Sequence, residues 1–191
     1  MTKSTTTISV FSLAGFGLMA QAATSVHLAP RVHTGGVGLV LVGAQRRTLS
    51  SVTAAQADGA ITRGLVSADR KTLTFHQPNI YVVARSGPAS DMLSYRIDGL
   101  RNPTLVVPRG AIFKVLYINT DDDMTHNLRF GRGHAASTPS VGTPNLAHKS
   151  NTAFHAADMT LRMPTRPGNY YYFCTVPGHA QGGMWGSLRI H

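Results

Sequence analysis

The chain has 191 residues, with 18 Lys and Arg against 8 acidic side chains, all of them Asp, and a formal net charge of +10. A single cysteine excludes a disulfide framework, and the length leaves room for one domain with a substantial hydrophobic core. Basic charge would suit nucleic acid, but the arginines are scattered and no such motif is present, so we expect no nucleic-acid partner.

Residues 1–22 have the pattern of a secretory signal peptide. Lys3 supplies a positive start, the segment from Ile8 to Met19 is apolar, and Ala20-Gln21-Ala22 offers the small residues of a cleavage site. The apolar run is shorter than the roughly 20 residues that a membrane-spanning helix needs. We therefore expect cleavage after Ala22, export to the periplasm and no stable membrane insertion of the mature protein.

Residues 23–70 form an N-terminal extension with weak structural signals. Glycines interrupt the apolar run at 37–42, so residues 24–48 could form a glycine-rich strand, a flexible leader or a poorly ordered tail. Ser50 or Ser51 could cap a short helix that reaches about Thr62. No candidate catalytic or binding residue lies in this segment.

Residues 71–191 have the pattern of an all-β sandwich. Short runs rich in β-branched and aromatic residues alternate with turn residues. Several of these runs are apolar at every position, which indicates packing on both faces. Residues 131–151, rich in Gly, Ser, Thr and Pro, are predicted to form a long loop. The predicted strands lie near Leu73–His76, Ile80–Ala84, Leu93–Ile97, Leu105–Val107, Ile112–Asn119, Asn127–Phe130, Met159–Met163, Tyr170–Cys174 and Ser187–Ile190.

The segment 170–184 carries the candidate chemistry. Cys174, His179 and Met184 follow an aromatic strand at the spacing Cys-x4-His-x4-Met. With a second histidine they would supply the two-histidine, one-cysteine set with a weak axial methionine that binds blue copper. His126, which follows the apolar run 111–118, is the best candidate for that histidine. An isolated cysteine is more often an ordinary core residue, but the accompanying His and Met argue against that interpretation.

These residues make the sequence similar to the cupredoxins, the type 1 blue copper proteins, and within them to the rusticyanin branch. The resemblance rests on residues 101–111, 118–120 and 168–186. It implies a Greek-key β-sandwich with a loosely structured, partly helical N-terminal extension. It also implies one copper ion, cycling between Cu(I) and Cu(II), with His126, Cys174 and His179 as equatorial ligands and Met184 as the axial ligand.

One position departs from the rusticyanin branch. That branch has serine after the first histidine, whereas this chain has Asn127, as most other cupredoxins do. We expect the Asn127 side chain to brace the two ligand loops and to donate a hydrogen bond toward the thiolate. Contacts of this kind tune the reduction potential of a metal.

The resemblance further implies a monomeric electron carrier rather than an enzyme, with no catalytic residues. Its partners would be redox proteins, either c-type cytochromes or a terminal oxidase chain, and iron oxidation is one such pathway. Two other functions stay open. A copper chaperone or storage protein would bind Cu(I) without redox cycling, and a cysteine–histidine hydrolase would use Cys174 as its nucleophile. A copper oxidase would need histidines beside the cysteine, where this chain has Phe173 and Thr175.

Several further residues lie near the candidate ligands in the sequence. The run Asp121–Asp123 is predicted to be a solvated turn rather than a docking or calcium-binding patch, and Trp185 an ordinary core residue. Tyr170 and Tyr172 share strand parity with Cys174 and should shield the site or core. His179 is expected to expose its ring edge within an apolar patch formed by Pro177, Ala180, Met184 and Trp185. His134, His148 and His155 are not expected to bind a second metal.

Overall fold

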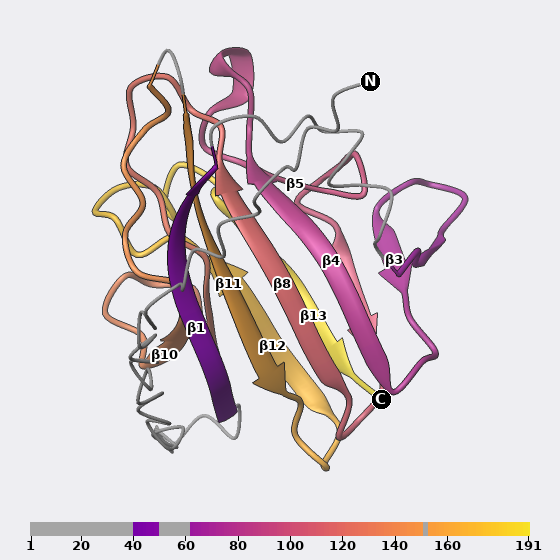
Figure 1. Cartoon of the computed structure of the whole chain (residues 1–191). Coiled ribbons are helices and arrows are strands. Elements are labelled where there is room, and N and C mark those ends of the chain that lie inside the picture. The colour runs from indigo at the N-terminus through magenta and orange to yellow at the C-terminus, as the bar shows by residue number, and fades with distance from the viewer. Residues whose placement is uncertain (1–39, 50–61, 151–152) are drawn as a thin grey trace, which may run out of the picture.

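The computed structural model describes residues 40–49 as backbone and residues 62–150 and 153–191 with their side chains, and it contains two β-sheets (Figure 1). The six-stranded sheet has the order β1 (Val40–Leu49), β11 (Phe154–Arg162), β8 (Ile112–Asn119), β4 (Asn79–Ser86), β5 (Tyr95–Ile97) and β6 (Leu100–Arg101). The seven-stranded sheet has the order β10 (Ser140–Gly142), β9 (Arg129–Gly131), β12 (Gly168–Phe173), β13 (Trp185–Ile190), β7 (Thr104–Val107), β3 (Thr72–Thr74) and β2 (Leu65–Val66). One short 3-10 helix, η1 (Ala89–Asp91), precedes β5.

The two sheets enclose one main hydrophobic core, so the predicted all-β sandwich is confirmed. Phe113, Val115 and Tyr117 of β8 face Tyr172 and Leu188 of the opposite sheet within this core. A second, smaller cluster contains Val83, Leu116, Ile118 and Ala156 on the other face of the six-stranded sheet. The central strands are therefore apolar on both faces, as their sequences predicted.

The strand predictions were accurate where hydrophobicity is continuous. β8 spans Ile112–Asn119 as predicted, whereas β11 begins at Phe154, five residues before the predicted start at Met159. The short strands β2, β6 and β10 were not predicted, and β10 lies within the segment that we expected to be a long loop. Strands of two or three residues carry too few side chains to produce a recognisable alternation.

The N-terminal extension contributes a strand to the sandwich. β1 pairs antiparallel with β11 along its length, with a register shift between Leu41 and Gly43. Of the three possibilities for residues 24–48, the strand is thus correct for residues 40–48. The predicted signal peptide and nearly all of the predicted helix from Ser50 to Thr62 lie outside the described residues. Within the described residues, no helix is both long and apolar enough to cross a membrane.

Candidate metal centre

Cys174 lies immediately after β12, at the start of a loop that folds back on itself. Its backbone N–H donates to the carbonyl of Met184 over 3.1 Å, and the Met184 N–H donates to the carbonyl of His179 over 3.0 Å. The loop turns at Gly178 and Gly183, whose φ angles of 86° and 106° fall in the region that glycine tolerates best. These bonds bring His179 and Met184 back toward the cysteine.

His126 reaches the same place from the segment between β8 and β9. Its backbone exchanges two hydrogen bonds with Leu146, of 3.1 and 2.8 Å, which fix it as an isolated bridge. Just beyond it, β9 pairs antiparallel with β12, with Arg129 opposite Phe173. Residues that are far apart in the sequence, 126 and 174, therefore meet because each lies just beyond one end of the same strand pairing.

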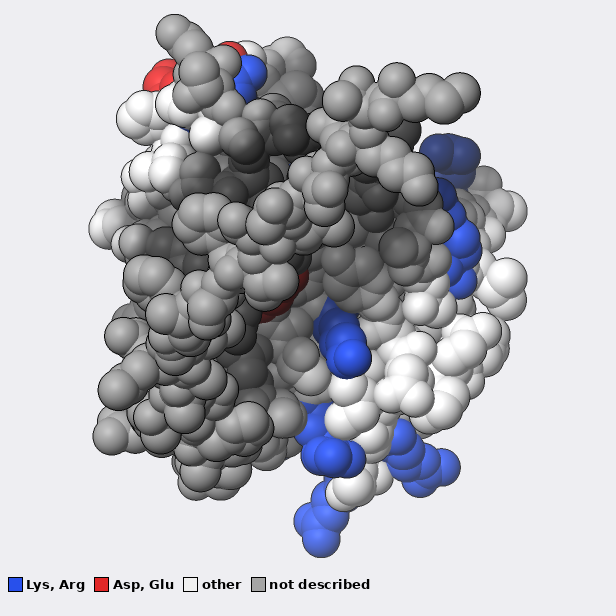
Figure 2. Space-filling view, viewed as in Figure 1, with Lys and Arg blue, Asp and Glu red and all other residues white. Residues whose placement is uncertain are grey.

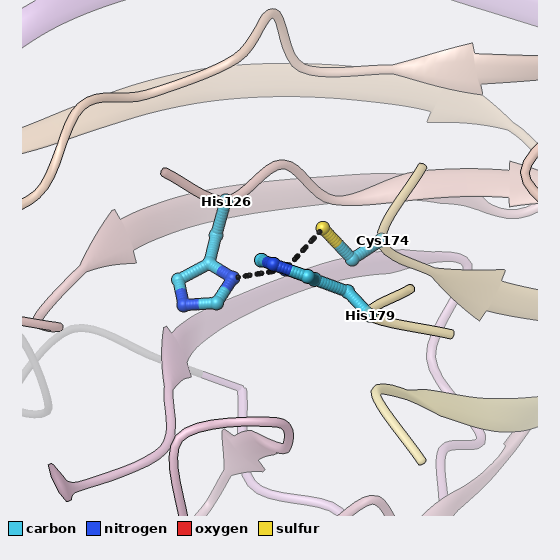
Figure 3. A group of neighbouring side chains, drawn as sticks. All are labelled: His126, Cys174 and His179. Atoms are coloured by element: carbon cyan, nitrogen blue, oxygen red, sulfur yellow. Dashed lines mark hydrogen bonds between the residues drawn. The ribbon is translucent and has the colours of Figure 1, made fainter. Parts of the chain in front are cut away.

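The three predicted equatorial ligands converge, as Figure 3 shows. His126 Nδ1 lies 3.1 Å from His179 Nδ1, and Cys174 Sγ lies 3.5 Å from His179 Nδ1. All three candidate ligand atoms lie within 4.8 Å of one another. His126 and Cys174 are buried and His179 is half-buried, so the group is open to solvent only on the His179 side.

Met184 is fully buried beside this group in the core. Its backbone is bonded to both Cys174 and His179, as described above. The role of its thioether as an axial ligand stays a prediction.

Burial favours the uncharged forms of the three clustered side chains in the metal-free protein. Burial raises the pKa of the Cys174 thiol, although hydrogen bonding from the backbone of Asn127 and Val176 opposes the rise. Burial lowers the pKa of His126, opposed by Asp121, and burial together with His126 lowers the pKa of His179. Both imidazoles are therefore held neutral, and a nearby cation would favour the thiolate. Two imidazole nitrogens and one soft sulfur fit copper well.

Asn127 connects the two ligand loops. Its Oδ1 accepts a hydrogen bond from the Thr175 backbone N–H over 2.9 Å. Its Nδ2 donates to Thr175 Oγ1 over 2.8 Å and to Asn145 Oδ1 over 2.7 Å. The expected brace is present, but both amide hydrogens are directed at these oxygens rather than at the thiol.

The interpretation of the aspartate run was wrong for its first member. Asp122 and Asp123 are exposed, as in a solvated turn, but Asp121 is buried with its Oδ2 3.0 Å from His126 Nε2. Burial alone would raise the pKa of Asp121, but hydrogen bonds from the Asp123 N–H, the His126 ring and the Met124 N–H lower the pKa to about 2. Sequence reasoning missed this contact; its only signal was an acidic residue two positions after the end of a buried strand and five positions before the histidine.

The expectations for the side chains around the three clustered residues were partly wrong. Ala180 and Met184 are buried, so they do not contribute to an exposed apolar patch with Pro177. Trp185 is half-buried rather than a core residue, and its ring stacks on that of His134 at 4.1 Å between centroids. Tyr170 and Tyr172 are buried on the core side with Cys174, as their parity predicted.

No second metal group was found in the described part of the chain. Among those residues, the only cluster of three or more His, Cys or Asp side chains with the geometry to hold an ion is His126, Cys174 and His179. His134 instead stacks on Trp185, and His148 is exposed.

Comparison with known proteins agrees with this geometry. Residues 101–191 match the family model described as copper binding proteins, plastocyanin/azurin family. The rusticyanins of Acidithiobacillus ferrooxidans and Acidithiobacillus ferridurans are each 31% identical over 167 residues, which cover 82% of this chain and 87% of theirs. The solved structure of rusticyanin from Thiobacillus ferrooxidans superposes with a TM-score of 0.66 at 29% identity, over 77% of this chain and 97% of that one. The chain therefore belongs to the cupredoxins, the blue copper proteins of the plastocyanin/azurin family, and within them it resembles rusticyanin.

Proposed function

We propose that this protein is a blue copper electron carrier that passes single electrons between redox proteins. The observation that carries the proposal is the convergence of one ring nitrogen from each of two histidines and one cysteine Sγ within 4.8 Å, in a largely buried site. Copper, when bound, supplies the one-electron Cu(II)/Cu(I) couple. The backbone hydrogen bonds that hold the ligand loops would keep the donor atoms in place when copper changes oxidation state, which would limit the reorganisation that accompanies electron transfer.

We assign different roles in metal binding and electron transfer to individual residues of the chain. Cys174, His126 and His179 would hold the ion, and we assign Met184, which is buried beside them, as the fourth, weaker ligand. His179 is the most exposed of the three clustered ligands, so we assign the entry and exit of electrons to its ring edge. We further propose periplasmic export, a monomeric carrier and a redox chain with c-type cytochromes or a terminal oxidase, of which iron oxidation is one setting.

The absorption spectrum after Cu(II) is added to the purified protein tests this function. We expect an intense blue band that disappears on reduction, returns on oxidation and is absent from Cys174→Ala. A Cu(I) chaperone would give no band that cycles reversibly. A cysteine hydrolase would show hydrolysis that depends on Cys174 without copper. Either result in place of the blue band would overturn the proposal.

Asn127 provides a test of how the site is tuned. Asn127→Ser removes the side chain that links the loops through Thr175 and Asn145. We expect the reduction potential to change, because loosening contacts around the ligands alters the relative stability of the two oxidation states. Redox titration of both proteins measures the change, with Ser140→Ala as a control, because the Ser140 hydroxyl bonds to Arg129 rather than linking the two ligand loops. Equal potentials for wild type and Asn127→Ser would show that the brace does not tune the site.

A further inference from the structure

The buried carboxylate of Asp121 contacts two backbone N–H groups and the ring of His126. Its Oδ1 accepts hydrogen bonds from the backbone N–H groups of Asp123 and Met124, over 3.0 and 3.1 Å. Its Oδ2 lies 3.0 Å from His126 Nε2. The side chains of Asp121 and His126 are only 2% and 0% exposed, so this contact is shielded from water.

This arrangement selects one tautomer of His126. A backbone N–H can only donate, so Oδ1 is an acceptor, and an ionised carboxylate offers only acceptors to Nε2 as well. With an ionised Asp121, the 3.0 Å contact would place the ring proton of His126 on Nε2 and would leave the lone pair of Nδ1 free. Nδ1 is the atom that faces His179 and the metal centre. A carboxylate that orients a ligating histidine in this way also raises the basicity of the ring.

We propose that Asp121 is a positioning residue for the copper centre: it fixes the tautomer and ring orientation of His126 and lowers the reduction potential by placing a buried negative charge one imidazole away from the ion. The proposal rests on the proposed function, in that it assumes that His126 binds copper. Cu(II) carries one more positive charge than Cu(I), so a nearby anion stabilises the oxidised form more. Burial keeps that interaction from being screened by water and salt.

Asp121→Asn tests the charge, with Asp122→Asn as the matched control. Both variants lose one negative charge, but the Asp122 side chain is 60% exposed and pairs with Lys149 on the surface. We expect Asp121→Asn to weaken binding of Cu(II) relative to Cu(I) by at least tenfold, which raises the potential by about 59 mV for one electron. Asp122→Asn should shift it far less. Equal shifts in the two variants, or none, would overturn the proposed role of the buried charge.

A second measurement needs no copper. Side-chain ¹⁵N NMR of the metal-free protein reports which ring nitrogen of His126 carries the proton. We expect the Nε2–H form alone in wild type and in Asp122→Asn, and a mixture of forms in Asp121→Asn. An unchanged tautomer in Asp121→Asn would contradict the positioning role even if no blue protein forms. Failure of the blue band in wild type would instead count against the function proposed above.

Asp121→Ser covers the case in which Asp121→Asn does not fold. A serine oxygen can still accept from the backbone N–H groups of the turn, but its shorter side chain gives up the contact with His126. The same rise in potential and the same loss of tautomer selection are expected. A folded Asp121→Ser protein with wild-type potential and tautomer would exclude the proposed role.

Discussion

At the scale of single residues, three buried tyrosine hydroxyls near the copper centre differ in their hydrogen bonding. Tyr95 donates to the carbonyl of Asn127 over 2.6 Å, and Tyr172 donates to the carbonyl of Pro103 over 2.6 Å. The hydroxyl of Tyr117 is buried and has no partner among the described residues. Burial raises the pKa of all three phenols well above the ordinary value, so they stay neutral.

The unpaired hydroxyl predicts a stabilising substitution. Tyr117→Phe removes a buried polar group that lacks a bond, and should raise the free energy of unfolding by about 1 kcal/mol. Tyr172→Phe is the matched control, because it breaks a bond and leaves a buried carbonyl unpaired, and should lower the free energy by about 1–2 kcal/mol. Urea titration of the metal-free proteins measures both. Losses of similar size would mean that a buried water satisfies Tyr117.

The sequence predicted candidate metal ligands where their spacing along the chain was distinctive. Cys174, His179 and Met184 stood out because three soft or nitrogen donors lie on one short loop. Asp121 did not stand out, because an Asp run in a turn looks the same whether its first member is solvated or buried against a histidine. Whether Asp121 is solvated or buried depends on where the turn packs in the folded protein, and the local sequence does not specify that position.

At the scale of structural elements, Asp91 ties η1 to the β5–β6 hairpin beside the ligand loop. Its carboxylate accepts hydrogen bonds from Arg101 Nε and Nη2 over 2.7 and 2.9 Å, and from Arg96 Nη2 over 2.8 Å. The same hairpin contacts the ligand loop, because Asn102 Nδ2 donates to the carbonyl of Gly183 over 2.9 Å. Asp91 thus stabilises the hairpin that packs beside the ligand loop.

Asp91 gives a pH prediction with a defined sign. The hydrogen bond from Arg101 is the largest cause that lowers its pKa below 3.8. The unfolded chain therefore binds more protons in this range, so the stabilisation is complete above about pH 4 and is lost as the pH falls through the folded pKa. Asp91→Asn should cost about 0.5–1 kcal/mol at neutral pH for this partly exposed pair, and the difference from wild type should vanish in acid.

Unfolding of the metal-free protein between pH 2 and pH 6 measures that difference. Asp122→Asn, at an exposed ion pair with Lys149, is the control and should show a smaller effect. A difference between wild type and Asp91→Asn that does not change with pH would show that packing, not charge, accounts for the contribution of Asp91.

A strand could be predicted from sequence when its own side chains showed a clear apolar pattern. β8 is apolar enough to be recognised alone, whereas β1 contains glycine and several polar residues and becomes a strand because β11 pairs along its length. Such pairing joins residues that are far apart in the chain. A local pattern therefore could not choose between a strand and a flexible leader for that segment.

At the scale of the whole molecule, the ligand set depends on one long-range pairing. β9 and β12 are neighbours in the seven-stranded sheet, and this places the residues just beyond their adjacent ends, His126 and Cys174, side by side. Sequence could propose His126 as the missing ligand, but it could not show that these two strands pair. The convergence of the ligands is thus a property of the topology rather than of a motif.

The charge of the whole molecule predicts how fast it encounters small charged redox reagents. The full sequence has a net charge of +10 from 18 basic and 8 acidic side chains, and of these only Lys3 lies in the predicted signal peptide. Figure 2 shows basic side chains at several separate places on one face. Such a molecule attracts acidic partners over a distance set by the Debye length, about 10 Å at 0.1 M salt and 3 Å at 1 M.

Stopped-flow oxidation of the reduced copper protein by small reagents measures this attraction. With an anionic oxidant such as hexacyanoferrate(III), we expect the second-order rate constant to fall about tenfold or more between 0.01 and 1 M salt. With a cationic cobalt(III) complex the rate constant should rise over the same range, because salt then screens repulsion. Parallel responses to the two oxidants would indicate that the surface around His179, rather than the overall positive charge, governs the encounter.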